Sequence, residues 1–133
     1  MKILKYILFL LLIAFVGGAL YLATIDGNYE VKRTRLVKAP LEVAFEVVND
    51  YKTWEYWGPW NETDSTIVYT FPEKTVGAGA TFSWKASSGD GNMENLVSVL
   101  NDSIQDITFF DGKGTVNGTW KFKKVAEGVE ITW

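Results

Sequence analysis

The sequence predicts an α+β domain preceded by an apolar N-terminal helix. Three features of its 133 residues predict this class. Residues 6–25 carry no charge, residues 40–57 show short helical patterns, and residues 65–133 alternate strand-like runs with turn residues. Because the connections between those runs are short, they favour an antiparallel meander over a parallel sheet. We therefore expect an anchor at residues 1–25 and a folded domain at residues 26–133.

The uncharged N-terminal run is long enough to cross a bilayer. It holds 20 residues, from Tyr6 to Ile25, and a helix of that length spans about 30 Å. Tyr6 and Tyr21 lie near its ends, where tyrosine rings favour the membrane interface. The alternative is a cleaved signal peptide, but the run exceeds the usual apolar length, and Tyr21 is too bulky for a cleavage site ending at Ala23. We expect an uncleaved single-pass anchor.

Flanking charges bear on the orientation of this anchor. Lys2 and Lys5 precede the run and Asp26 follows it, which favours a cytoplasmic N-terminus and an extracytoplasmic domain. Four basic residues beyond the other end argue the opposite way: Lys32, Arg33, Arg35 and Lys38. We give them less weight because they fall within a predicted strand. The prediction is a membrane protein with its domain outside.

The residue types that are missing narrow the chemistry. The chain has no cysteine and no histidine, which excludes thiol nucleophiles, Ser-His triads, imidazole-bound metals and disulfides. Residues 26–133 carry 16 acidic and 11 basic residues, a net charge of −5, whereas nucleic-acid-binding domains are normally basic. We therefore expect no nucleic-acid partner. The stretch Asp90–Glu94 lacks the ligand spacing of a calcium-binding loop, and we expect no metal and no cofactor.

The domain is predicted to begin with a strand and two short helices. Tyr29–Lys38 has the β-branched composition of a strand. Pro40 then suits the first position of a helix whose apolar residues recur at helical spacing. Its apolar face consists of Leu41, Ala44, Phe45 and Val48, and its polar face of Glu42, Glu46 and Asn49. A second short helix is expected at Asp50–Trp57, ended by Gly58-Pro59.

Six strands should follow, separated by turn signals. Their expected ranges are Ser65–Phe71, Ala80–Ala86, Asn92–Leu100, Ser103–Phe110, Thr115–Val125 and Val129–Trp133. The last strand alternates apolar with polar residues, and the sequence ends inside it. Because the two short helices look too small to cover an apolar sheet face, we expect a missing C-terminal helix. Without it, Val129, Ile131 and Trp133 should remain exposed.

The domain resembles a known superfamily in five segments. They are Ala39–Phe45, Asn49–Trp60, Gly91–Met93, Asn101–Ile104 and Gly118–Phe122. These segments are similar to the START-related superfamily, also called SRPBCC or polyketide cyclase/dehydratase-like, in its membrane-anchored bacterial form. The resemblance covers Tyr29 to Trp133 and implies a helix-grip fold, in which a curved antiparallel sheet and a long C-terminal helix enclose a hydrophobic cavity. This chain departs from that pattern by lacking the last helix.

Aromatic residues on the expected sheet face and helix end are the candidate ligand-binding residues. Trp54, Trp57 and Trp60 recur every third residue, and the strand pairs Phe82/Trp84 and Trp120/Phe122 each share one face. Met93 adds an adaptable side chain at the start of the neighbouring strand. The same eight residues suit a packed core, and sequence alone does not separate core packing from ligand lining.

Three functional hypotheses follow. The first is a binding module for a hydrophobic small molecule or lipid, because aromatic area is abundant and no nucleophile apparatus is present. The second is a cyclase/dehydratase-like enzyme using a pocket carboxylate, with Glu94 as first candidate among Glu55, Glu62, Asp64, Glu94 and Asp106. The third is a protein-interaction module with an exposed aromatic face. We favour the non-enzymatic binding module and assign no catalytic residue.

Overall fold

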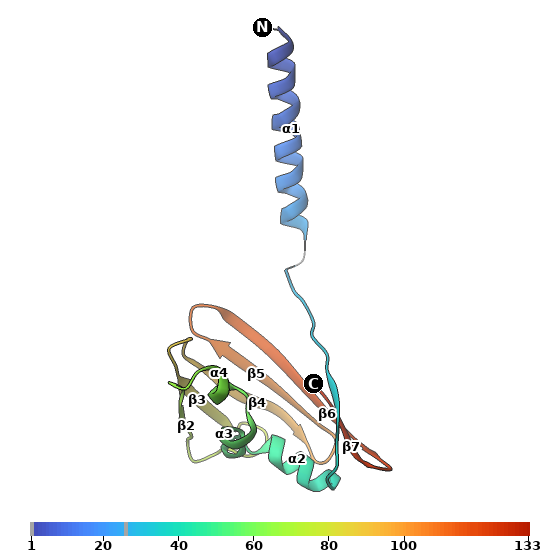
Figure 1. Ribbon diagram of the computed structural model, residues 1–133, viewed down its shortest axis with the longest axis vertical. Coiled ribbons are helices and arrows are strands. Elements are labelled where there is room, and N and C mark those ends of the chain that lie inside the picture. The colour runs from blue at the N-terminus through green and yellow to red at the C-terminus, as the bar shows by residue number, and fades with distance from the viewer. Residues whose placement is uncertain (1, 26) are drawn as a thin grey trace. The chain divides into compact units, whose positions relative to one another are not determined.

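The computed structural model describes residues 2–25 and 27–133 (Figure 1). Contacts divide the chain into two compact units, one that reaches Val31 and a second at Lys32–Trp133. The first unit contains helix α1 (Lys2–Thr24). Its segment Ile3–Thr24 has a mean hydropathy of 2.5 and is unburied. By length and composition this helix can span a membrane.

The second unit is built on a seven-stranded antiparallel sheet, which confirms the predicted fold class. The sheet order is β1-β7-β6-β5-β4-β3-β2. The strands are β1 (Thr34–Val37), β2 (Val68–Thr70), β3 (Thr81–Lys85), β4 (Gly91–Val99), β5 (Ser103–Phe110), β6 (Gly114–Val125) and β7 (Gly128–Thr132). From β2 to β7 the chain is a meander, and β1 pairs with the last strand to complete the sheet. The first strand is shorter than the predicted Tyr29–Lys38, although Arg33 also exchanges backbone hydrogen bonds with Trp133.

Helix α2 (Leu41–Asn49) buries the face that its sequence predicts. Ala44, Phe45 and Val48 are buried. Asn49, which we expected on the polar face, is buried as well. Its Oδ1 accepts a hydrogen bond from Ser98 Oγ at 2.7 Å, so a specific partner compensates for its removal from water.

The predicted second helix is split into short turns. A 3₁₀ turn, η1 (Tyr51–Thr53), leads into α3 (Trp54–Trp57), and α4 (Trp60–Thr63) follows Gly58-Pro59. The start of η1 is capped by Asp50, whose carboxylate accepts from the Lys52 backbone N–H. Gly58 is extended and Pro59 follows it, so the helical path breaks between α3 and α4.

The short helices cover more of the sheet than the sequence suggested. Helix α2 packs on β6 and β7. The rings of Phe45 and Phe122 meet edge to face, with their centroids 5.3 Å apart. Val129 is 0% exposed and Ile131 is 7% exposed, so the expectation that these two side chains stay wet is wrong. Trp133 is 38% exposed and stacks on Trp120 at 5.6 Å.

A bulge in β4 sets which of its side chains face the buried side of the sheet. The pairing of β4 with β5 shifts between Asn95 and Val97. Asn95 pairs with Asp106, and Ser98 pairs with Ile104. Asp106 and Ile104 are both buried. Leu96 is therefore an extra residue in the strand, which is why the sequence of β4 shows no simple alternation.

Candidate ligand-binding site

Trp54 is the centre of an aromatic cluster on the helix-covered face of the sheet. It is 2% exposed, and its indole N–H donates to the Val48 carbonyl at 2.9 Å. Trp60 stacks on it with ring centroids 5.5 Å apart and planes within 6°. Four further rings lie within 5.1–6.1 Å of Trp54: Tyr51, Trp57, Phe82 and Trp120. The predicted Trp segment and the predicted strand aromatics thus meet in one cluster.

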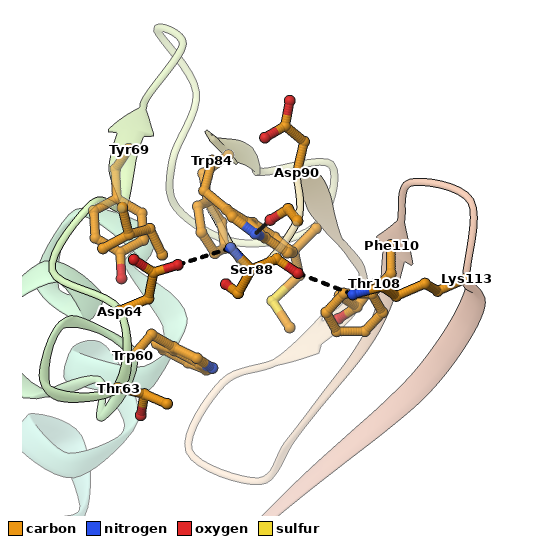
Figure 2. Close-up of a pocket in the computed structure, with 14 residues that line it drawn as sticks. Trp60, Thr63, Asp64, Tyr69, Trp84, Ser88, Asp90, Thr108, Phe110 and Lys113 are labelled. Carbon is orange, nitrogen blue, oxygen red and sulfur yellow. Dashed lines mark hydrogen bonds between the residues drawn. The ribbon is translucent and has the colours of Figure 1, made fainter. Parts of the chain in front are cut away.

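Beside this cluster lies a cavity of about 280 Å³. Its aromatic wall comes from α4, β2, β3 and β5, and Figure 2 shows side chains of these elements arranged around a shared space. The lining residues are Trp60, Thr63, Asp64, Ile67, Tyr69, Phe82, Trp84, Ser88, Gly89, Asp90, Met93, Thr108, Phe110 and Lys113. The wall is therefore mostly apolar, and the polar groups gather at the Ser88–Asp90 loop and near α4.

The structure divides the eight candidate residues into two sets. Trp60, Phe82, Trp84 and Met93 line the cavity. The other four lie outside its lining: Trp54, Trp57, Trp120 and Phe122. Of these, Trp54 and Phe122 are core residues, and Trp57 is 39% exposed with its indole N–H on the Thr53 hydroxyl.

Sequence reasoning missed several residues of the cavity wall. Thr108 and Phe110 come from β5, and Tyr69 comes from β2. The alternation in β5 holds the signal for two of them, because Ile104 and Asp106 share the inward face with Thr108 and Phe110. The three-residue strand β2 is too short to show an alternation.

A hydrogen-bonded clasp joins three segments at the rim of the cavity, formed by Asp64, Ser88 and Lys113. The Asp64 carboxylate accepts from the Ser88 backbone N–H at 2.9 Å, and Lys113 Nζ donates to the Ser88 carbonyl at 2.9 Å (Figure 2). Asp64 also accepts from the Thr66 backbone N–H and from the Ser87 hydroxyl. Hydrogen bonds from Thr66 and Ser88 hold the pKa of Asp64 well below its usual range.

Two polar details distinguish the wall from a purely apolar one. The Tyr69 hydroxyl is buried and has no hydrogen-bond partner among the described residues, and burial, with a smaller effect of Glu55, raises the pKa of this phenol. Trp84 donates its indole N–H to the Gly89 carbonyl at 3.1 Å, which fixes its ring beneath the loop.

A buried polar group lies outside the cavity lining. Tyr51 donates its hydroxyl to Asn95 Oδ1 at 2.7 Å, and the Trp120 indole N–H donates to Asp106 Oδ2 at 2.9 Å. Asp106 is 3% exposed, and this burial raises its pKa, while the Trp120 hydrogen bond opposes that rise. Burial, followed by the charges of Asp106 and Glu94, raises the pKa of Tyr51 far above its usual value. The deeply buried carboxylate is therefore Asp106, whereas Glu94, our first candidate, is only partly buried.

Comparisons place the fold but not the activity. No protein-family model matches the sequence, and no curated protein matches it. A Chromobacterium violaceum protein has a TM-score of 0.59 at 18% identity, over 77% of this chain and 74% of its own. A Staphylococcus epidermidis protein has a TM-score of 0.59 at 16% identity, over 82% and 72% of the two chains. DynU16, a protein of the dynemicin biosynthetic locus, has a TM-score of 0.55 at 20% identity, but the match covers only 35% of its length and 77% of this chain. At these identities the similarity shows a shared helix-grip type of sheet.

Proposed function

We propose that this chain is a membrane-tethered binding module that takes up a hydrophobic small molecule or lipid in the aromatic cavity. The observation that carries the proposal is a cavity of about 280 Å³ whose wall includes five aromatic rings: Trp60, Tyr69, Phe82, Trp84 and Phe110. Sites for small apolar molecules are concave, mostly apolar and equipped with a few polar groups that orient the ligand. Ser88 and Lys113 contribute such polar groups to the lining.

We also propose membership of the START-related, or SRPBCC, superfamily. The antiparallel sheet and the position of the short helices after β1 agree with the resemblance of the sequence. The location of the cavity differs from the expected one, because its wall is formed by α4 and strands β2 to β5 rather than by a C-terminal helix. The ligand pocket proposed here therefore depends on the Trp60–Thr63 turn and on the Ser88 loop.

Residues 6–25 are proposed to anchor the domain to the membrane. Helix α1 has the length and composition of a span, and its segment Ile3–Thr24 is unburied. An anchored domain stays beside a source of apolar molecules. The flanking Lys5 supports an N-terminus in the cytoplasm and a domain on the other side.

The carboxylates around the cavity support binding rather than catalysis. Asp64 is fully engaged by hydrogen-bond donors, and Asp90 accepts from the Ala86 backbone N–H. Asp106 has the burial expected of a tuned acid, yet it lies outside the lining. General acid catalysis requires a carboxyl group within hydrogen-bond reach of the ligand. The cyclase/dehydratase alternative therefore has weaker support than a carrier.

The proposal is tested by filling the cavity. Met93→Trp places a large ring in the wall, whereas Asn92→Trp places the same ring on the exposed neighbouring position of β4. Both full-length variants are reconstituted in nanodiscs and titrated with N-phenyl-1-naphthylamine and with palmitate. Because both carry the same anchor and lipid, partition into the bilayer cancels. Met93→Trp should bind at least roughly tenfold more weakly, and Trp84→Ala should also lose affinity. Equal binding by the two Trp variants would contradict the proposal.

A further inference from the structure

Charge is divided unevenly within the folded domain. One part, the basic edge, comprises residues 32–38 and 114–133, which contain β1, β6 and β7. It has seven basic and two acidic residues, a net charge of +5. The remaining part, residues 39–113, has four basic and twelve acidic residues, a net charge of −8. Because β1, β7 and β6 are consecutive in the sheet order, the positive charge gathers at one end of the sheet.

The basic side chains are free to meet a partner at the surface. All seven are solvent-exposed: Lys32, Arg33, Arg35, Lys38, Lys121, Lys123 and Lys124. The register brings the strands that carry them together, with Lys121 opposite Thr132 and Thr34 opposite Thr132 on the other side. Glu130, opposite Lys123, is one of only two acids in this part of the sequence. The pairing places Lys121 and Lys123 on one face of the sheet. Arg35 and Lys124 pair with the buried Ile131 and Val129 on the other face, so the basic edge carries positive charge on both faces of this end of the sheet.

We propose that the basic edge binds the anionic headgroups of the bilayer that holds the chain. This inference rests on the proposed anchoring of α1. A negatively charged membrane surface attracts Lys and Arg side chains that come within about 10 Å, the range set by ionic screening. Clustered basic residues bind anionic headgroups on the cytoplasmic side of many spans, and the same attraction acts on either side wherever the leaflet carries anionic lipid. The acidic part of the domain is repelled by the same surface.

The covalent tether favours lipid over an acidic protein as the partner. Residues 25–31 separate the end of α1 at Thr24 from the first basic residue, Lys32. Seven extended residues reach at most about 25 Å, so an anchored chain keeps the basic edge close to headgroups. A surface site held at such a distance binds at high effective concentration, even when each contact is weak.

The tryptophans of the protein provide the readout. All six lie in the folded domain, at position 54 or beyond, and α1 contains none. Energy transfer from Trp to dansyl-labelled headgroups therefore reports how close the domain lies to the bilayer. The full chain is reconstituted in phosphatidylcholine vesicles with or without 30% phosphatidylglycerol. Transfer should be roughly twofold higher on the anionic vesicles, and 0.5 M NaCl should remove the difference.

A pair of triple variants with the same change in net charge separates the basic edge from overall charge. Arg35→Gln/Lys121→Gln/Lys124→Gln removes three charges from the edge, and Lys52→Gln/Lys74→Gln/Lys85→Gln removes three exposed charges from the acidic part. Only the first should lose the lipid-dependent transfer. Equal loss of transfer in both triple variants, no dependence of transfer on lipid charge, or retention of the lipid effect by the edge variant would overturn the proposal.

Two further measurements separate the other outcomes. A domain that does not respond to phosphatidylglycerol but is captured by polyglutamate would assign the edge to an acidic protein instead. Flotation with neutral vesicles separately tests the anchor, so a chain that fails to float refutes the anchoring itself.

Discussion

The carboxylate of Asp106 fills the space that a side chain at Gly118 would need. The two residues are cross-strand partners in β5 and β6, and a Cβ added at position 118 would overlap that carboxylate. Asp106 in turn accepts the hydrogen bond of the Trp120 indole. A glycine inside a strand often marks such a close approach. Gly118 thus makes room for a buried acid that positions one of the central tryptophans.

Gly118→Ala should destabilise the domain by about 1–3 kcal/mol, because the added methyl group displaces the Asp106 carboxylate and breaks its bond with Trp120. Urea unfolding followed by circular dichroism measures the change. Thr119→Ala, at an exposed position of the same strand, is the control and should unfold near the wild-type midpoint. If Gly118→Ala unfolds at that midpoint too, the packing of Asp106 against Gly118 is not tight.

The buried Asp106 should make the domain less stable as the pH rises. Burial raises its pKa in the folded protein above the ordinary value of 3.8, so the folded state holds this proton more tightly than the unfolded state does. The resulting stabilisation is present at pH values below 3.8 and is lost as the pH rises through the folded pKa. Asp106→Asn removes this dependence. The stability of the variant relative to wild type should therefore increase with pH from about 4 and then level off. A constant difference across that range would refute the raised pKa.

Asp64 should contribute a dependence of the opposite sign. Its pKa is lowered in the folded protein by hydrogen bonds from Thr66 and Ser88, so its stabilisation is present above the unfolded pKa and is lost as the pH falls through the folded one. Asp64→Asn should therefore be less stable than wild type at neutral pH, and the two should converge in acid. Thermal melting between pH 2 and pH 7 checks the trend, and an unchanged gap at pH 2 would contradict it.

The hydroxyl of Tyr51 should contribute to the stability of the domain through its buried hydrogen bond with Asn95. Tyr51 is 0% exposed and Asn95 is 1% exposed, and Asn95 Nδ2 already has no partner within residues 27–133. Tyr51→Phe leaves the Asn95 carbonyl oxygen unpaired as well, which should cost about 1–3 kcal/mol. Tyr51→Phe/Asn95→Ala provides the double-mutant cycle. The two effects should be less than additive, and strict additivity would show that the hydrogen bond contributes nothing.

The sequence predicted the elements better than the connections between them. β5 was predicted with its observed bounds, Ser103–Phe110, because a clear alternation ends in strong turn residues. The burial of Val129 and Ile131 was not predicted. How far the nine-residue helix α2 covers β6 and β7 depends on tertiary packing, which the local sequence pattern does not show. Part of the cavity could be predicted from the sequence. Trp84 and Met93 indicated an apolar wall. The clasp could not be predicted, because residues 64, 88 and 113 become neighbours only in the folded domain.

The clasp should control how fast a ligand leaves the cavity. Both backbone polar groups of Ser88 are held: its N–H donates to Asp64, and its carbonyl accepts from Lys113. Lys113→Met keeps the length of the side chain but removes the donor, a loss of about 1 kcal/mol that corresponds to roughly fivefold faster opening of the loop. Release of N-phenyl-1-naphthylamine should accelerate by that factor, and amide exchange at Ser88 should accelerate with it. Lys85→Met, at an exposed position on β3 outside this cavity lining, is the matched control. Faster exchange at Ser88 without faster release would show that the probe leaves by another route.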